Sequence, residues 1–117
     1  MTNPLLDPDL EVTCAQTAQA LEDGSATVID VREPYEWEAG RIAGVRHIPL
    51  GRLAAEAESI DPARPVIFHC RLGVRSLMAA QAFKGAGLDA KSMAGGIQAW
   101  HAEARAMEPE GATVAEH

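Results

Sequence analysis

The 117-residue sequence contains little cysteine and few aromatic residues: two cysteines, and phenylalanine, tryptophan and tyrosine at 4% in all. Two cysteines are too few for a disulfide framework, and neither Cys14 nor Cys70 has a second cysteine two or three residues away. The spacings of these cysteines and of the histidines match no zinc-ligand pattern. We therefore expect no structural disulfide and no bound metal, and we expect at least one free, chemically active thiol.

Long apolar runs are also missing. No stretch approaches the roughly 20 apolar residues that a membrane-spanning helix requires. The first nine residues, MTNPLLDPD, lack the basic and apolar regions of a secretory signal. We therefore expect a soluble cytoplasmic protein with no membrane partner.

Positive charge is scarce, and the little there is lies mostly in one place. The chain carries a net charge of −7, which disfavours nucleic acids and anionic membranes as partners. Residues 62–88 nevertheless contain Arg64, Arg71, Arg75 and Lys84 and no acid, a local charge of +4. A short basic segment in an acidic chain is suited to binding a small anion.

The length is that of one domain, with ordinary globular composition. Residues 1–9 are predicted to be a flexible lead-in, because they hold two prolines and two aspartates. Residues 10–107 are predicted to form the domain. Residues 108–117 lack periodicity and are predicted to be a flexible tail.

Strand and helix patterns alternate along residues 10–107, which predicts an α/β fold with a parallel sheet. Thr13 and Gln16 have the spacing of a capping box at the start of a helix that Gly24 ends. The other elements are predicted as buried strands at 27–31 and 65–70, shorter strands at 10–12, 47–49 and 90–93, and helices at 34–37, after 51, at 76–87 and at 97–107.

Cys70 is the strongest candidate for chemistry. It ends a predicted buried strand, and ligands of parallel α/β sheets bind beyond the carboxyl ends of the strands. The segment 70–76 leads from this strand into a helix, so backbone N–H groups and the positive end of the helix dipole face the thiol. These donors, together with Arg71 and Arg75, favour thiolate over thiol. Gly73 would allow the turn that aims successive amides inward.

The alternative reading of Cys70 is a buried structural thiol, because free cysteine is often buried. The arginines at +1 and +5, the glycine at +3 and the serine at +6 favour the reactive reading. His69 adjoins Cys70 but should point to the opposite face of the strand, which favours a packing role. Asp30 and Arg32 end the neighbouring strand and are candidates for the border of the pocket. Asp30 could pair with Arg75 or with the loop amides, and Arg32 could add positive potential or form a surface ion pair.

Four segments together resemble the rhodanese family of single-domain sulfurtransferases, and they occur in the family's order. They are Asp30 to Glu33 followed by Trp37, Gly40 to Gly44 continuing through Pro49, Cys70 to Ser76, and Gly95 to Trp100. Arg41 and Ala43 depart from the family's more usual histidine and proline, and His47 from its usual asparagine. The resemblance implies a rhodanese-like three-layer sandwich, in which a central parallel five-stranded sheet has helices on both faces.

The resemblance also implies the roles of the loop residues. Cys70 would be the sulfur acceptor that cycles through a persulfide. The substrate-binding loop would consist of Arg71, Leu72, Gly73, Val74, Arg75 and Ser76, with the two arginine side chains facing or bracing the bound anion. Asp30 and Arg32 are the supporting candidates.

The activity implied is thiosulfate sulfurtransferase activity by double displacement, without metal or organic cofactor. The expected partners are a small anionic sulfur donor, a thiol or cyanide acceptor, and a sulfur-accepting protein as a further candidate. One alternative is a carrier or interaction module that holds sulfur on Cys70 without turnover. A second is a cysteine phosphatase or arsenate reductase, but only four residues separate Cys70 from Arg75, one fewer than in those enzymes, and the tighter loop is cramped for a phosphoryl group.

Overall fold

The computed structural model describes residues 7–117, which form a five-stranded sheet in the order β1-β5-β4-β2-β3. All neighbouring strands are parallel. This confirms the predicted α/β class and the parallel five-stranded sheet. The strands are β1 (Glu11–Val12), β2 (Thr27–Asp30), β3 (Arg46–His47), β4 (Val66–His69) and β5 (Ala90–Met93).

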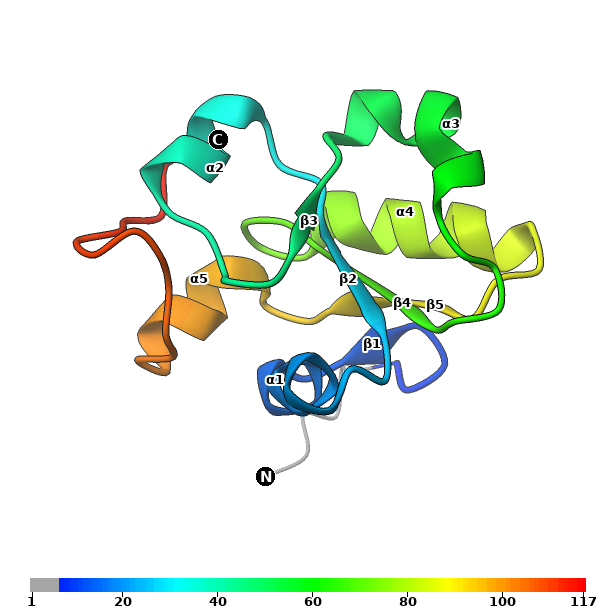
Figure 1. Cartoon of the computed structure of the whole chain (residues 1–117), viewed down its shortest axis with the longest axis horizontal. Helices are drawn as coiled ribbons and strands as arrows, with labels where there is room; N and C mark the ends of the chain where they lie inside the picture. Colours follow the sequence, from blue (N-terminus) through cyan, green and yellow to red (C-terminus); the bar gives the residue numbers. More distant parts are fainter. Residues whose placement is uncertain (1–6) are drawn as a thin grey trace.

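Helices cover both faces of this sheet (Figure 1). They are α1 (Cys14–Asp23), α2 (Pro34–Ala39), α3 (Leu53–Glu56), α4 (Val74–Gly85) and α5 (Gly96–Ala102), with 3-10 turns at Leu50–Arg52 and Ala57–Ser59 on either side of α3. Figure 1 places α3 and α4 on one side of the sheet and α1 and α5 on the other. The three-layer arrangement expected from the resemblance is therefore confirmed.

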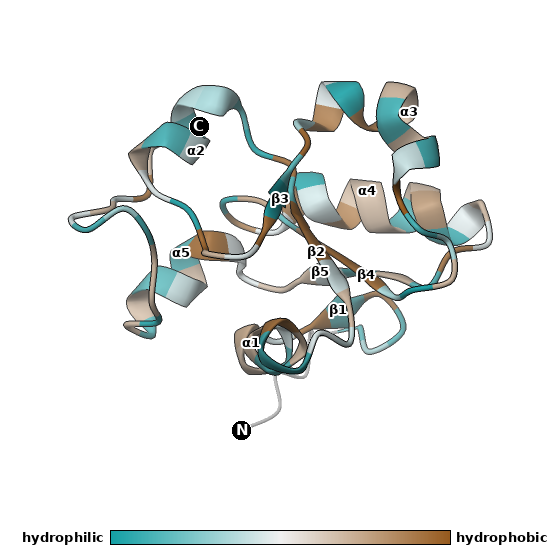
Figure 2. Cartoon of the chain, viewed as in Figure 1, coloured by the Kyte–Doolittle hydropathy of each residue, from teal (hydrophilic) through white to brown (hydrophobic). Residues whose placement is uncertain are grey.

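The core consists of two apolar clusters, one on each face of the sheet, and Figure 2 shows the central strands β2 and β4 as hydrophobic. Side chains alternate between the faces of a strand. Ile29 and Phe68 accordingly join the cluster beneath α3 and α4, whereas Val28 and Ile67 join the cluster beneath α1 and α5. Strands buried on both faces need no polar side, which explains the continuous apolar runs in the sequence.

The start of α1 is the capping box that the sequence predicts. The backbone N–H of Gln16 donates to Thr13 Oγ1 at 3.0 Å, and the N–H of Thr13 donates to Gln16 Oε1 at 2.8 Å. Gly24 ends the helix with a left-handed φ of 69°. The chain can therefore begin this helix without any tertiary contact.

The last helix is shorter than predicted, because α5 ends at Ala102 and not near Met107. Ala104 takes a φ of 57°, and the indole N–H of Trp100 donates to the carbonyl of Ala106 at 2.9 Å. The chain then pairs with a distant segment, where Arg41 and Glu108 exchange backbone hydrogen bonds of 2.9 and 2.8 Å. These contacts turn the chain away from the helix axis.

Residues 108–117, the predicted flexible tail, continue along α2 (Figure 1). The N–H of Thr113 donates to the carbonyl of Ala39 at 3.0 Å, and the hydroxyl of Tyr35 donates to the carbonyl of Glu116 at 3.1 Å. The flexibility of this segment and the domain boundaries at 9 and 107 stay predictions, and most of the expected lead-in lies outside the described residues.

No helix within residues 7–117 combines the length and the apolar character that crossing a bilayer requires.

Candidate active site

The loop 70–73 connects the end of β4 to the start of α4, and it turns at a glycine. Gly73 is the N-cap of α4 and has a φ of 105°, a conformation that side chains with a Cβ rarely adopt. The helix begins at Val74, two residues earlier than predicted. Gly73 therefore lets the backbone reverse directly over the Cys70 side chain, as the sequence indicates.

The sulfur of Cys70 is held by polar donors. The N–H of Gly73 donates to Cys70 Sγ at 3.1 Å, and Ser76 Oγ lies 3.5 Å from the same sulfur. Ser76 Oγ lies in turn 2.7 Å from Ser92 Oγ, and both serines are fully buried. Ser92 comes from β5, and sequence reasoning missed it because nothing local connects it to the loop. The arrangement offers hydrogen bonds to a negatively charged sulfur at this position.

The N-terminus of α5 fixes the outer side of the loop. The N–H of Ile97 donates to the carbonyl of Cys70 at 2.8 Å, and the N–H of Gln98 donates to the carbonyl of Arg71 at 3.0 Å. A Cβ on Gly96 would overlap both of these carbonyl groups. Glycine at this position therefore lets α5 approach the loop closely enough to hold two of its carbonyls.

Arg75 is held by a carboxylate that sequence reasoning did not single out. Its Nη1 and Nη2 donate to Oε1 and Oε2 of Glu36 at 2.8 and 3.0 Å, and the Glu36 side chain is fully buried. Burial alone would raise the pKa of Glu36, but the hydrogen bonds and charge of Arg75 and the backbone N–H of Glu33 together outweigh it and lower that pKa. The same pair raises the pKa of Arg75. The sequence signal that could have pointed to Glu36 was its spacing from Glu33. The backbone N–H of Glu33 donates to the side chain of Glu36 at the start of α2.

Asp30 and Arg32 pair with each other below the loop. Arg32 Nη2 donates to Asp30 Oδ2 at 2.8 Å and to the carbonyl of Gly40 at 2.7 Å, and both side chains are fully buried. This corrects two expectations, because Asp30 does not pair with Arg75 and Arg32 is not at the surface. A buried guanidinium needs a carboxylate close by, and Arg32 is nearer along the chain than Arg75. Burial would raise the pKa of Asp30, but His69 and the hydrogen bonds and charge of Arg32 together override this, and the pKa is lowered.

His69 lies close to Asp30 and does not line the cavity at Cys70. Its Nε2 is 3.8 Å from Asp30 Oδ2, and the ring is fully buried. Burial lowers the pKa of His69 more than the neighbouring carboxylate raises it. The imidazole is therefore held neutral near physiological pH, which fits a packing role.

A cavity of about 290 Å³ opens over the Cys70 sulfur. Arg71 Nε is buried and has no hydrogen-bond partner among residues 7–117. Leu72 and Val74 are 55% and 69% exposed at the mouth, whereas Cys70 is 1% exposed at the floor. The lining residues are Cys70, Arg71, Leu72, Val74, Arg75 and His117. Gly73 and Ser76 contact the sulfur but do not line the cavity, and neither do Asp30 and Arg32.

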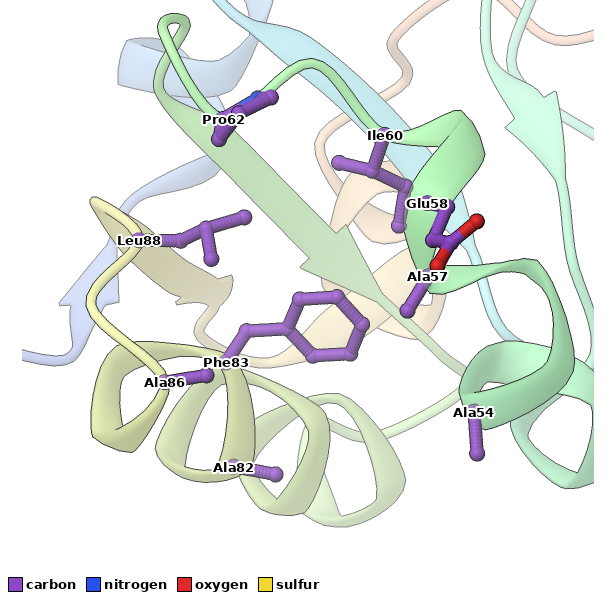
Figure 3. Close-up of a pocket in the computed structure, with 9 residues that line it drawn as sticks. All are labelled: Ala54, Ala57, Glu58, Ile60, Pro62, Ala82, Phe83, Ala86 and Leu88. Atoms are coloured by element: carbon purple, nitrogen blue, oxygen red, sulfur yellow. The ribbon is translucent and has the colours of Figure 1, made fainter.

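A second cavity of about 400 Å³ lies between α3 and α4 (Figure 3). Phe83, Ile60 and Leu88 form its apolar walls, and Glu58 is the one ionisable residue that lines it. It contains no nucleophile and no cluster of donors, so the smaller cavity at Cys70 is the better candidate for chemistry. No three His, Cys, Asp or Glu side chains within residues 7–117 are grouped as a metal site would require.

The rhodanese-like domain family matches residues 13–103, which is most of the chain. The chain belongs to the rhodanese-like domain family. This confirms the resemblance of the four sequence segments.

Two relatives of this rhodanese-like chain come from Bacillus subtilis. The uncharacterized protein YqhL is 39% identical over 82 residues, covering 69% of this chain and 65% of YqhL. The chain thus spans less than two thirds of that relative. The putative sulfurtransferase YtwF is 30% identical over 96 residues, covering 81% of this chain and 93% of YtwF.

A third relative and a solved structure agree with this assignment. The thiosulfate sulfurtransferase GlpE of Ectopseudomonas mendocina is 34% identical over 88 residues, covering 74% of this chain and 81% of GlpE. The crystal structure of a rhodanese-related protein from Thermoplasma volcanium superposes with a TM-score of 0.78 at 28% identity, covering 85% of this chain and 97% of that one. Rhodanese-like sequence and rhodanese-like fold therefore occur together in this chain.

Proposed function

We propose that this rhodanese-like chain is a sulfurtransferase, which moves a sulfane sulfur from thiosulfate or a persulfide donor to cyanide or a thiol through a persulfide on Cys70. The observation that carries the proposal is the hydrogen bond from the Gly73 N–H to Cys70 Sγ at the floor of a cavity lined by two arginines. A thiol buried only for packing needs neither the donor nor the opening. Names of relatives such as GlpE and YtwF support the same class of reaction.

In the first step, the Cys70 thiolate attacks the outer sulfur of the donor. A new S–S bond forms, the old bond between the donor sulfurs breaks, and sulfite leaves with the electron pair when the donor is thiosulfate. The buried Nε of Arg71 is a donor free to bind an oxygen of the anion. The positive charges of Arg71 and Arg75 reduce the repulsion between thiolate and anionic donor.

In the second step, the acceptor takes the outer sulfur from the persulfide. Cyanide or a thiolate attacks this sulfur, the S–S bond to Cys70 breaks, and the electron pair returns to Cys70 as thiolate. Gly73 N–H and Ser76 Oγ then hold the leaving sulfur as they hold the resting one. This route uses no metal and no organic cofactor.

Two other functions use the same loop and make different predictions. A carrier would accept sulfur and release it only to a partner protein. A phosphatase would need room for a phosphoryl group around the sulfur, and the four residues between Cys70 and Arg75 close the loop tightly, with Gly73 directly on Cys70 Sγ. A cytoplasmic location and a sulfur-accepting protein partner stay predictions of the sequence.

The test is the production of thiocyanate from thiosulfate and cyanide. We expect repeated turnover by the intact chain, none by Cys70→Ser, and undiminished turnover by the matched control Cys14→Ser. Sulfur loading of Cys70 without turnover would show that the chain is a sulfur carrier and not an enzyme. Phosphate release from an aryl phosphate without thiocyanate formation would overturn the proposal in favour of the phosphatase.

A further inference from the structure

Residues 108–117 lie beyond the stretch 13–103 that matches the family, yet they return to the candidate active site. The segment is attached to α2 at two points, through the Thr113 N–H on the Ala39 carbonyl and the Tyr35 hydroxyl on the Glu116 carbonyl. Figure 1 shows its end beside α2. Between these points Val114 packs against the apolar cluster beneath α1 and α5. The segment therefore has a defined path.

The end of this path is at the Cys70 cavity. Every other lining residue comes from the continuous stretch 70–75, whereas His117 arrives from a different part of the chain. The loop thus forms the floor and one side of the cavity, and His117 contributes the wall that the loop cannot provide. Removing it would leave a one-sided depression over the sulfur.

We propose that His117 forms the outer wall of the Cys70 cavity and limits the size of the sulfur compound that reaches Cys70 Sγ. The inference rests on the proposed function in so far as that compound is a sulfur donor. It makes His117 a specificity-determining residue that favours a small inorganic or short aliphatic donor over a bulky aromatic one.

The dimensions of the site support this. The cavity measures about 290 Å³, and pockets for drug-sized ligands run from roughly 300 to 1,000 Å³. Cys70 is 1% exposed, so a reagent must enter the cavity to reach the sulfur. A single side chain on the wall of so small a cavity occupies a large part of the space through which a reagent reaches the sulfur.

The first experiment needs no sulfur transfer. In a Cys14→Ser background, Cys70 is alkylated with iodoacetamide, which is small, and with a fluorescein-linked maleimide, which is bulky. We expect deletion of residues 115–117, and His117→Ala, to raise the rate with the bulky reagent several-fold while the rate with iodoacetamide stays nearly the same. His117→Trp should lower the rate with the bulky reagent.

Two further variants keep the test sharp. Tyr35→Phe removes the hydroxyl that holds Glu116 and should raise the bulky-reagent rate without touching the wall itself. Glu110→Ala changes an exposed residue of the same segment that does not line the cavity, and it should change neither rate. If deletion of residues 115–117 prevents folding, His117→Ala and Tyr35→Phe decide the question.

The second experiment compares thiosulfate with an aromatic thiosulfonate as sulfur donor to cyanide. The deletion should raise kcat/KM for the aromatic donor several-fold relative to thiosulfate. If the ratio of the two alkylation rates is unchanged in the deletion and in His117→Ala, the proposal that His117 forms the outer wall is wrong. Failure of the proposed function is a different outcome, in which the alkylation ratio shifts as expected but no variant forms thiocyanate.

Discussion

The guanidinium of Arg75 and the carboxylate of Glu36 form a two-point ion pair, with Nη1–Oε1 and Nη2–Oε2 distances of 2.8 and 3.0 Å. The pair connects the first turn of α4 to α2, and Arg75 is the member of the pair that lines the Cys70 cavity. The ion pair fixes the orientation of the Arg75 side chain, and Arg75 remains part of the cavity lining. A fixed positive charge at this position needs little reorganisation when an anion binds.

Replacing Arg75 should therefore affect both activity and stability. We expect Arg75→Ala to lower kcat/KM for thiosulfate by about 10²-fold, the usual effect of losing one preorganised donor. It should also lower the free energy of unfolding by about 2 kcal/mol, because the buried carboxylate of Glu36 loses its charged partner. Thiocyanate formation and urea unfolding measure the two effects.

The matched control is Arg105→Ala, because Arg105 pairs with Glu103 and is not among the residues that line the Cys70 cavity. We expect it to change the free energy of unfolding by no more than about 0.5 kcal/mol. Equal losses of activity in the two variants would show that the loop is not the binding site.

The stability of the fold should fall as the pH is lowered below neutral, first through His69. Its pKa in the fold is lowered from the ordinary value of 6.5, so below that pH the unfolded chain takes up a proton that the folded chain does not. The stability that the neutral ring contributes is present above pH 6.5 and decreases below it. Asp30 adds to the loss at lower pH, because its pKa is lowered from 3.8 and its contribution disappears as the pH falls through the folded value.

Urea midpoints measured between about pH 8 and about pH 5 test the sign. We expect a falling midpoint in the intact chain and a flatter profile in His69→Gln. His101→Gln, which changes an exposed histidine at the end of α5, should keep the original slope. A profile of the same steepness in His69→Gln would show that His69 is not the titrating group.

The two cysteines should differ sharply in reactivity near neutral pH. Cys14 is buried beneath α5, and burial together with the charge of Glu103 raises its pKa to about 11, so it stays a thiol. Cys70 lies at the floor of an open cavity and receives the Gly73 N–H. Brief treatment with iodoacetamide should label Cys70 alone, and peptide mapping identifies the site. Labelling of Cys14 at a similar rate would contradict the assignment.

Glycine at position 96 should be necessary for the loop. A Cβ there would overlap the carbonyl groups of Cys70 and Arg71, and the φ of 59° disfavours any other residue. We expect Gly96→Ala to lower the free energy of unfolding by about 2 kcal/mol and to reduce thiocyanate formation. Gly51→Ala, where the added Cβ meets nothing within 4 Å, serves as the control and should be near neutral in thermal unfolding.

Local signals in the sequence predict much of the fold. The capping box of Thr13 and Gln16 and the continuous apolar runs of β2 and β4 depend on neighbouring residues, so they can be recognised without a structure. The candidate loop can be recognised from the sequence for the same reason, because Cys70 and Gly73 are three residues apart and their hydrogen bond is local.

Contacts between distant segments could not be predicted in this way. Glu36 and Arg75 are 39 positions apart, and only the folded sheet brings α2 beside the loop. The early end of α5 has the same origin, because the chain leaves the helix to pair Glu108 with Arg41. His117 is the extreme case, since residues 108–117 show no periodicity from which their path along α2 could be inferred.

The most direct test of the account is the intact mass of the chain after brief exposure to thiosulfate without an acceptor. We expect a gain of about 32 Da, one sulfur atom, on the intact chain and on Cys14→Ser, and its loss on addition of cyanide. Cys70→Ser should gain nothing. An unmodified mass in the intact chain, or the same gain in Cys70→Ser, would contradict the claim that Cys70 carries the sulfur.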